Sequence, residues 1–286
     1  MQPPVNINPT QRMLHTVTAG QLTSDGDGVM MTRIIGTPEL NMLDPFLLLD
    51  VFETNQAQDY IGGFPDHPHR GFETVTYLLA GRMRHKDNAG HEGVIEPGGV
   101  QWMTAGKGII HSEMPEQENG LLQGFQLWIN LPASEKMQVP AYQEFPANKI
   151  AVEQLSNDTE IRVIAGSTNN GITGPVTNCY VNPTFFDVLL PKNQSFEQTV
   201  DVVDNVLIFV INGELSVGEK SQKIGHHQMG ILHKGNQVVV TANKKSRFLL
   251  VAAQPLNEPV ARGGPFVMNP KVEILQAIED YKQNKF

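Results

Sequence analysis

The stretch HPHRGFETVTYLL, residues 67–79, sets two histidines two positions apart, directly before a run rich in β-branched and aromatic residues. In a β-strand, residues i and i+2 face the same side, so His67 and His69 would project into one space, as a metal requires. Pro68 lacks an N–H group and belongs at a strand start or on an edge strand. The stretch therefore predicts a metal-binding strand at a barrel rim, although two surface histidines in a Pro-containing loop would give the same pattern.

A second stretch, QWMTAGKGIIHSEMP (residues 101–115), repeats this spacing with His111 and Glu113. On its own the pair is weak, since His and Glu two positions apart are common on solvated strands. Together the two pairs supply three nitrogens and one oxygen. On a five- or six-coordinate metal such a set leaves positions open for a substrate and oxygen.

The rest of the chain reads as short β-rich runs separated by Gly, Asn or Pro clusters, which is typical of an all-β sandwich or barrel. The expected strands are Phe46–Val51, Glu73–Leu79, Gln123–Leu131, Phe185–Leu190, Val206–Val217, Gln237–Thr241 and Arg247–Ala252. Residues 77–81 and 209–213 have a similar pattern, in which a strand runs into a Gly turn. This similarity suggests that one barrel unit occurs twice in the chain.

The length of 286 residues suits two domains. We expect an N-terminal metal-binding domain over residues 1–135, a linker rich in Pro, Ala and polar residues over 136–149, and a C-terminal domain without metal over 150–286. One helix is predicted at about residues 270–284. Asn269 would cap it, Pro270 fits its first position, and Ile274, Ile278 and Tyr281 form its apolar stripe.

Four segments resemble the pirin family. They are the two His-bearing stretches, GFQLWINLP at residues 124–132, and GGPFVMN at residues 263–269. The resemblance covers most of the chain, and the two His-bearing stretches are highly specific.

The resemblance implies a bicupin, with two cupin domains (double-stranded β-helix or jelly-roll barrels) of which the N-terminal one holds a single metal. Carried over residue by residue, the ligands are His67, His69, His111 and Glu113. The expected metal is iron, as Fe(II) or Fe(III), with Mn, Ni, Co, Cu and Zn also compatible with the ligands. Several pirins resemble quercetin 2,3-dioxygenases in activity, and others are described as regulatory partners of transcription factors or metabolic enzymes.

The general cupin pattern fits less well. Cupins commonly place a Glu a few residues after the His pair, and Glu73 has the right parity to face the side of His69. They also place a third His shortly after a Pro-x-Gly turn, but here residues 97–99 are followed by Trp102, and the third His arrives at His111. We favour Glu113 as the fourth ligand and as the catalytic base, and keep Glu73 as the alternative.

Two functions follow as hypotheses. The first is an O₂-dependent, CO-releasing dioxygenase that acts on a flavonol-like aromatic substrate such as quercetin, with Glu113 taking the proton of the substrate hydroxyl. The second is a non-enzymatic, iron-dependent redox sensor that binds a partner protein. An open, aromatic-sized cavity over the metal would favour the enzyme, and a sealed metal with an exposed apolar patch nearby would favour the regulator. A monomer is expected in either case.

For the other histidines we favour structural interpretations over further chemistry. His85 and His91 lie in a polar stretch that we interpret as a solvated loop, although they could line the mouth of the pocket as acid–base groups. In the second half, His226, His227 and His233 are close in sequence, but we expect polar turn residues there rather than a second metal.

Other side chains near the two motifs have structural interpretations. Arg70 could orient an anionic group, but we expect it to pair with Glu73. Four large apolar residues could form a wall for an aromatic substrate, but we expect most of them to fill the barrel core. They are Trp102, Met103, Phe125 and Trp128.

Composition narrows the partners and the compartment. The formal net charge is −9, and no basic cluster is longer than Lys244-Lys245, which argues against direct nucleic-acid binding. The single cysteine, Cys179, excludes an intrachain disulfide and suits a reducing compartment. We recognise no signal peptide and no apolar run near the ~18 residues that a membrane span needs. A cytoplasmic protein is therefore expected.

Overall fold

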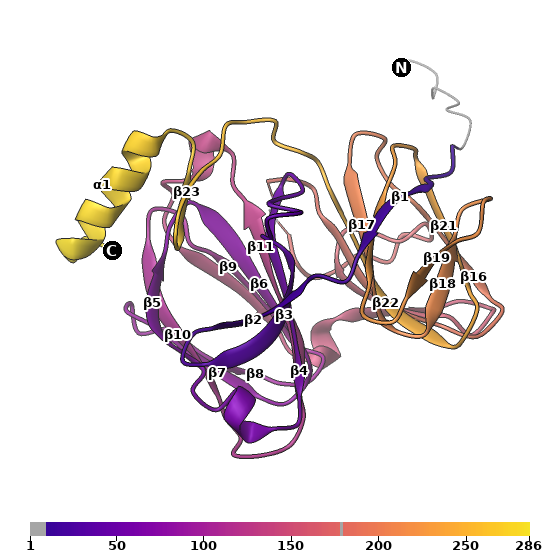
Figure 1. Cartoon of the computed structure of the whole chain (residues 1–286), viewed down its shortest axis with the longest axis horizontal. Coiled ribbons are helices and arrows are strands. Elements are labelled where there is room, and N and C mark those ends of the chain that lie inside the picture. The colour runs from indigo at the N-terminus through magenta and orange to yellow at the C-terminus, as the bar shows by residue number, and fades with distance from the viewer. Residues whose placement is uncertain (1–9, 178–179) are drawn as a thin grey trace. The chain divides into compact units, whose positions relative to one another are not determined.

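The β-rich runs of the sequence form antiparallel strands in the computed structural model, which describes residues 10–177 and 180–286 (Figure 1). Strand β7 (Met83–Asp87) illustrates why, because its residues alternate between buried and exposed positions, as a half-buried strand requires. Besides strands and the loops between them, the described residues form three short 3-10 turns and one α-helix. Cys179 lies outside the described residues.

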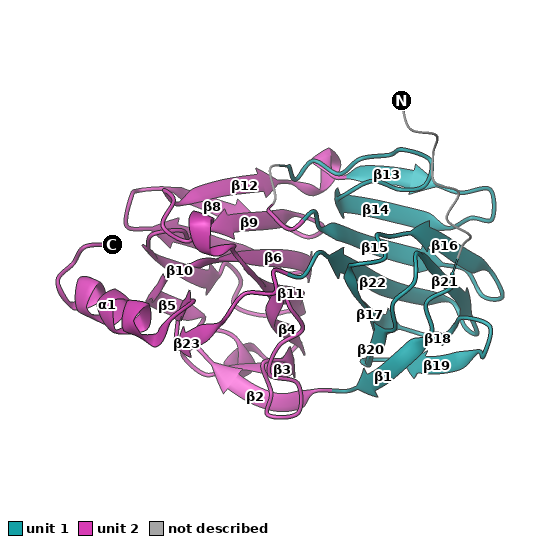
Figure 2. Ribbon diagram, turned by 90° about the horizontal axis from the view of Figure 1, so that it is seen from above, with its two compact units in different colours: residues 1–19, 151–177, 182–255 teal, residues 20–150, 178–181, 256–286 magenta. Residues whose placement is uncertain are grey.

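The strands form two compact units, which we call the N-terminal and the C-terminal barrel (Figure 2). The N-terminal barrel consists mainly of Gly20–Ile150 and Leu256–Phe286. The C-terminal barrel consists mainly of Ala151–Thr177 and Asn182–Pro255, completed by the N-terminal strand β1 (Leu14–Thr18). Each barrel combines a seven-stranded and a four-stranded sheet, which is the expected bicupin architecture.

The seven-stranded sheet of the N-terminal barrel has the order β12-β9-β6-β11-β4-β3-β2, and its four-stranded sheet has the order β5-β10-β7-β8. The strands of the large sheet are β2 (Gln21–Asp25), β3 (Val29–Ile35), β4 (Phe46–Thr54), β6 (Phe72–Ala80), β9 (Val100–Thr104), β11 (Leu122–Asn130) and β12 (Ala141–Phe145). Besides β7, the small sheet contains β5 (Phe64–His69), β8 (Glu92–Ile95) and β10 (Ile109–Pro115). The 3-10 turns are η1 (Ala57–Asp59), η2 (Ala133–Glu135) and η3 (Ala147–Lys149).

The C-terminal barrel repeats this plan with the orders β1-β20-β17-β22-β15-β14-β13 and β16-β21-β18-β19. Its other strands are β13 (Ala151–Gln154), β14 (Glu160–Ala165), β15 (Thr184–Leu190), β16 (Ser195–Thr199), β17 (Asn205–Asn212), β18 (Glu214–Val217), β19 (Gln222–Gly225), β20 (Met229–Leu232), β21 (Gln237–Ala242) and β22 (Ser246–Ala253). The inward faces of these strands form an apolar core that includes Phe186, Phe196 and Phe248.

All seven expected strands are present, but the run Val206–Val217 is two strands, β17 and β18. Gly213 separates them with a φ of 93°, a left-handed conformation that side-chain-bearing residues rarely adopt. The chain therefore turns where the sequence alone suggested one continuous strand.

Each unit combines stretches from different parts of the chain, whereas the domains expected from the sequence were continuous. Strand β1 pairs with β20 in the C-terminal barrel, whereas the segment after Pro255 returns to the N-terminal barrel. The segment expected as a linker, residues 136–149, contains β12, which pairs along its whole length with β9. Backbone groups of these segments find their hydrogen-bond partners in strands that are distant in sequence, which local composition does not reveal.

The C-terminal segment forms a hairpin, β23 (Ala261–Gly263) and β24 (Phe266–Met268), and then helix α1 (Lys271–Lys282). The apolar stripe is present, since Ile274 is buried and Ile278 packs beside it, while Tyr281 stays 37% exposed. The predicted cap is wrong. The capping residue is Pro270, without a side-chain hydrogen bond, and the Asn269 amide instead donates to Glu258 and to the Pro259 carbonyl.

Among the described residues, no helix has the length and the apolar character that crossing a bilayer would require.

Candidate metal centre

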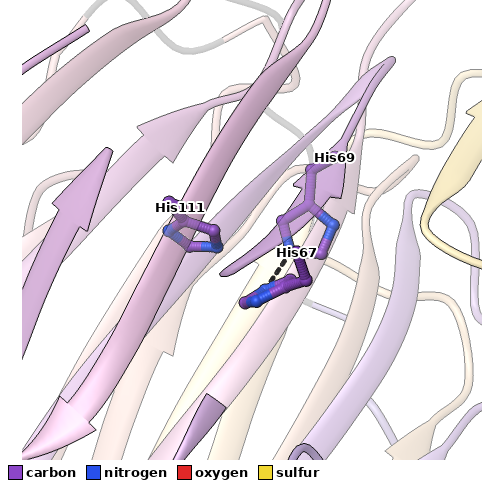
Figure 3. A group of neighbouring side chains, drawn as sticks. All are labelled: His67, His69 and His111. Carbon is purple, nitrogen blue, oxygen red and sulfur yellow. Dashed lines mark hydrogen bonds between the residues drawn. The ribbon is translucent and has the colours of Figure 1, made fainter. Parts of the chain in front are cut away.

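Three histidines from two neighbouring strands converge in the N-terminal barrel (Figure 3). His67 and His69 lie on β5, the edge strand of the small sheet, so Pro68 occupies the edge position that its missing N–H requires. Strand β10 runs antiparallel to β5 and places His111 directly opposite His67. The ring centroids are separated by 4.5 Å for His67–His111, 4.7 Å for His67–His69 and 5.1 Å for His69–His111.

The backbone orients the first of these rings. Nδ1 of His67 lies 2.8 Å from the carbonyl oxygen of Pro65, which can only accept, so Nδ1 is the protonated nitrogen. This leaves the lone pair on Nε2, which faces Nε2 of His69 at 3.0 Å. Fixing the tautomer through the far nitrogen is the usual way in which proteins prepare a histidine for a metal.

The other two histidines are buried and neutral. Burial, and after it the neighbouring histidines, hold the pKa of His69 and of His111 well below the ordinary value. Both ring nitrogens of His111 are buried without a hydrogen-bond partner, an arrangement that costs about 1–3 kcal/mol per group in a protein interior. A metal ion would satisfy one of these nitrogens, so the residues present fit a metal.

Glu113 lies two positions after His111 on the same strand and is 4% exposed. The hydroxyl of Thr76 donates to its Oε1 at 2.9 Å, and the amide of Gln126 donates to its Oε2 at 3.3 Å. The carboxylate is therefore held in a fixed orientation. The group of ligand atoms within 4.8 Å of one another contains the three histidines alone, so coordination by Glu113 stays a prediction.

Glu73, the alternative ligand, lies on β6 of the large sheet. Its Oε1 accepts a hydrogen bond of 2.7 Å from the hydroxyl of Thr104, and the side chain is 2% exposed. Burial raises its pKa to about 6. Of the two carboxylates, Glu113 lines the pocket described next, and Glu73 is not among the described residues that line it.

A pocket of about 440 Å³ opens over His67 and His69. This volume falls in the range of sites for small organic ligands. Its walls are largely apolar, and its polar side chains include Glu113, Thr76, Gln126, Arg33 and Arg262. The apolar wall contains Met31, Leu48, Phe52, Phe64, Met83 and Trp128.

Trp128 differs in its location from the other three large apolar residues of the motifs. Trp102, Met103 and Phe125 are at most 1% exposed and fill the core, as expected. Trp128 instead packs its ring against His69 at a centroid distance of 5.1 Å and contributes to the pocket wall. The substrate-wall interpretation therefore applies to this one residue of the four.

The closing motif at residues 263–269 reaches this site from the far end of the chain. The backbones of Arg70 and Phe266 form a bridge, in which the N–H of Val267 donates to the carbonyl of Arg70 at 3.0 Å. Gly71 permits the approach, because a Cβ there would lie 2.1 Å from the carbonyl oxygen of Val267, and its φ is 87°. The motif thus fixes the backbone next to His69.

Arg70 does not pair with Glu73, contrary to expectation. Its guanidinium forms an ion pair with Asp280 of helix α1 at 2.8 Å, donates to the carbonyl of Lys107, and lies over the ring of Phe286. Residues 70 and 73 are close in sequence, but β5 ends at His69, and the turn at Gly71 directs the two side chains to different partners.

The solvated-loop interpretation is also wrong for His85, whereas His91 does lie in the loop between β7 and β8. His85 lies on β7 and is only 2% exposed, and His91 is half-buried against Tyr142 at a centroid distance of 4.3 Å. In the C-terminal barrel, Nδ1 of His226 donates to the carbonyl of Ile211, and the ring stacks on His227 at 3.8 Å.

Comparison with known proteins now decides the family. The model of the pirin family matches residues 28–129, and that of the pirin C-terminal cupin domain matches residues 185–286. The chain belongs to the pirin family. This pirin is 50% identical to a pirin-like protein of Caulobacter vibrioides over 94% of the chain and 97% of the relative, and 44% identical to human pirin over 92% and 89%.

Among solved structures, this pirin resembles the crystal structure of a quercetin 2,3-dioxygenase from Acinetobacter baumannii. The TM-score is 0.89 and the sequence identity is 33%, over 97% of this chain and 99% of that one. The similarity therefore extends over both barrels and not only over the one that contains the histidines.

Proposed function

We propose that this pirin is a metal-dependent dioxygenase that cleaves a flavonol-like substrate such as quercetin with O₂ and releases carbon monoxide. His67, His69, His111 and Glu113 would hold one metal ion, with iron the first choice and Mn, Ni, Co, Cu or Zn as alternatives. The supporting observation is the pocket of about 440 Å³, which is lined by His67, His69 and Glu113 and has a volume suited to a small aromatic molecule.

Three imidazoles and one carboxylate suit a divalent first-row metal and leave coordination positions free. When bound, such a metal supplies Lewis-acid chemistry, which lowers the pKa of a phenolic hydroxyl and favours its anion. The protein contributes the rest through its own side chains.

Glu113 is the base of the proposed mechanism. Its carboxylate faces the pocket and is oriented by Thr76 and Gln126, so it can accept the proton of a substrate hydroxyl without first reorganising. Trp128 supplies a flat wall beside His69 for the aromatic rings. The apolar lining excludes water, which strengthens the electrostatic interactions inside the pocket.

Arg262 is suited to bind the anionic side of the substrate. Arg33, the other guanidinium of the pocket, forms ion pairs with Asp50 and Asp25. The guanidinium of Arg262 donates to the backbone carbonyl of Leu47 and has no ion pair to a carboxylate among the described residues. Its charge is therefore available to a phenolate bound in the pocket.

The alternative, a redox-sensing regulatory protein that binds a partner, predicts a metal that is sealed from small molecules. The pocket beside the histidines favours the enzyme instead.

Turnover of quercetin tests the proposal. Metal-loaded protein should consume oxygen and release carbon monoxide, and His69→Ala should lose both activities together with the metal. His226→Ala, in the C-terminal barrel, is the matched control and should keep them. Wild-type protein that carries a full equivalent of metal and turns over neither quercetin nor related flavonols would refute the enzymatic function.

A further inference from the structure

The N-terminal barrel contains a second cluster of side chains of the kinds that bind metals. It adjoins the three histidines of β5 and β10, because His85 of this cluster pairs with Glu113 across β7 and β10. It consists of His85 on β7, His91 in the turn between β7 and β8, and Glu144 on β12. One ligand atom of each residue lies within 4.8 Å of the other two. Nε2 of His85 is 2.8 Å from Oε1 of Glu144, and Nε2 of His91 is 3.1 Å from Oε2 of the same carboxylate.

The fold fixes each of these three residues. His85 pairs in register with Gly93, where a Cβ would lie 2.5 Å from Nε2 of His85, so the imidazole lies across a position that has no side chain. Glu144 pairs with Gln101 in the β12–β9 ladder, and the Gln101 amide donates to its Oε1 at 2.6 Å. The pair of strands therefore aims the carboxylate at His85.

The turn that carries His91 is equally well ordered. The carboxylate of Asp87 accepts hydrogen bonds from the backbone N–H groups of Ala89 and His91, at 2.9 and 2.8 Å. The backbone of Asp87 also bonds to His91 and to Gly90. This closed turn holds the His91 ring against Tyr142, with Nε2 directed to Glu144.

The donor set suits a zinc-type ion. Two imidazoles and one carboxylate are a common zinc-binding combination, with a fourth position for water. Bonds of about 2.0–2.2 Å in a tetrahedron separate neighbouring ligand atoms by about 3.3 Å. The observed 2.8 and 3.1 Å run to the two different oxygens of Glu144. An ion held by both imidazoles would therefore be bound by both oxygens, or by one of them after the carboxylate turns.

Two further observations point to a missing ion. Nε2 of His91 is buried and lacks a well-directed hydrogen bond, although a carboxylate oxygen is 3.1 Å away. A pocket of about 600 Å³ is lined by Asp87, Tyr142 and, of the three cluster residues, His91, so this side of the cluster is open to small ions.

We propose that His85, His91 and Glu144 bind a second divalent metal ion, of the zinc type, in the N-terminal barrel. The competing explanation is that Glu144 merely bridges the two imidazoles by hydrogen bonds.

Metal stoichiometry separates the two explanations. The full chain is stripped with a chelator, dialysed against Zn²⁺ and, in a second series, Co²⁺, and analysed for metal per chain. Wild type should bind two equivalents. His91→Asn and Glu144→Gln should each retain one equivalent, because the affinity of the second site for the ion should fall at least about tenfold. His91 is half-buried in a turn, so its replacement should leave the fold intact. His226→Asn is the control and should bind two.

Cobalt identifies the site that is lost. The intense visible absorption of four-coordinate Co²⁺ should disappear in His91→Asn and persist in His111→Ala, which removes the first site instead. One equivalent in both wild type and His91→Asn would overturn the proposal, as would two equivalents in His91→Asn. Failure of His111→Ala to lose metal would count against the first site and leave the second untouched.

Discussion

Nε2 of His67 lies 3.0 Å from Nε2 of His69, and the tautomer of His67 is fixed because its Nδ1–H donates to the Pro65 carbonyl. Of these two nitrogens, Nε2 of His67 carries a lone pair. At this distance the two imidazoles can share one proton or bind one metal ion together. With His111 beside them, the three rings form a site whose ligands need little rearrangement to bind an ion.

Metal content will distinguish the two candidate carboxylate ligands. Glu113→Gln should weaken metal binding at the three-histidine site by at least about tenfold, because an amide oxygen is a poorer ligand than a carboxylate. Glu73→Gln should leave binding unchanged, since Glu73 bonds to Thr104 and is not among the pocket-lining residues. Titration of stripped protein with the metal, in competition with a chromophoric chelator, measures both affinities. The opposite order of effects would make Glu73 the ligand.

Glu73 should also make stability depend on pH. Its pKa rises from 4.5 to about 6 in the folded protein, mainly through burial. The folded state then binds more protons than the unfolded state between these values, so the free energy of unfolding falls as the pH rises through this window. At pH 7 the buried charge costs about 2 kcal/mol.

Replacing Glu73 by Gln should remove this cost. Glu73→Gln is therefore expected to be more stable than metal-free wild type at pH 7, by up to about 2 kcal/mol, and to lose this advantage near pH 4.5. Urea unfolding at several pH values measures the difference, with the exposed Glu118→Gln as control. A difference that does not change with pH would refute the assignment.

Lys136 should be a main anchor of the site. Its buried ammonium donates to the carbonyls of Gly71 and Val267, at 2.6 and 3.1 Å, and to the Asn130 amide oxygen at 2.6 Å. It thereby joins the His-bearing motif to the closing motif. Lys136→Met leaves three buried acceptors unsatisfied, each costing about 1–3 kcal/mol.

We expect Lys136→Met to lower the free energy of unfolding by about 3 kcal/mol or more. Chemical unfolding of the variant measures this loss, and the exposed Lys149→Met serves as the matched control with little change expected. A loss below about 1 kcal/mol would show that the three segments hold together without the ammonium.

Arg262 should affect substrate binding more than chemistry. Arg262→Met removes the guanidinium that lacks a carboxylate partner in the pocket. KM for an acidic phenol should therefore rise about tenfold, which corresponds to a loss of about 1.4 kcal/mol of binding free energy, and kcat should change little. Arg82→Met, whose arginine pairs with Glu96 and Glu116 at the surface, is the control. Steady-state kinetics decide the matter, and a fall in kcat at constant KM would assign Arg262 a different role.

Local sequence was sufficient for the strands and for placing each pair of candidate ligands on one side of its strand. The i, i+2 spacing of His67 with His69, and of His111 with Glu113, sets the side of the strand on which each residue lies, because side chains alternate along any strand. Pro68 likewise predicted an edge strand from its own chemistry, and β5 is one. The helix cap was not predictable in this way, because Asn269 found partners in Glu258 and Pro259 that compete with the capping position.

What the sequence by itself determined about this protein is therefore its β-strand content, its family and the candidate ligands. The tertiary structure decided which side chains meet. The antiparallel register of β5 and β10 brings His111 opposite His67, and strand β12, in a segment that composition suggests is a linker, brings Glu144 to His85. The pairing of Arg70 with Asp280 joins residues 210 positions apart. Such contacts depend on the register and packing of distant strands, which no local pattern encodes.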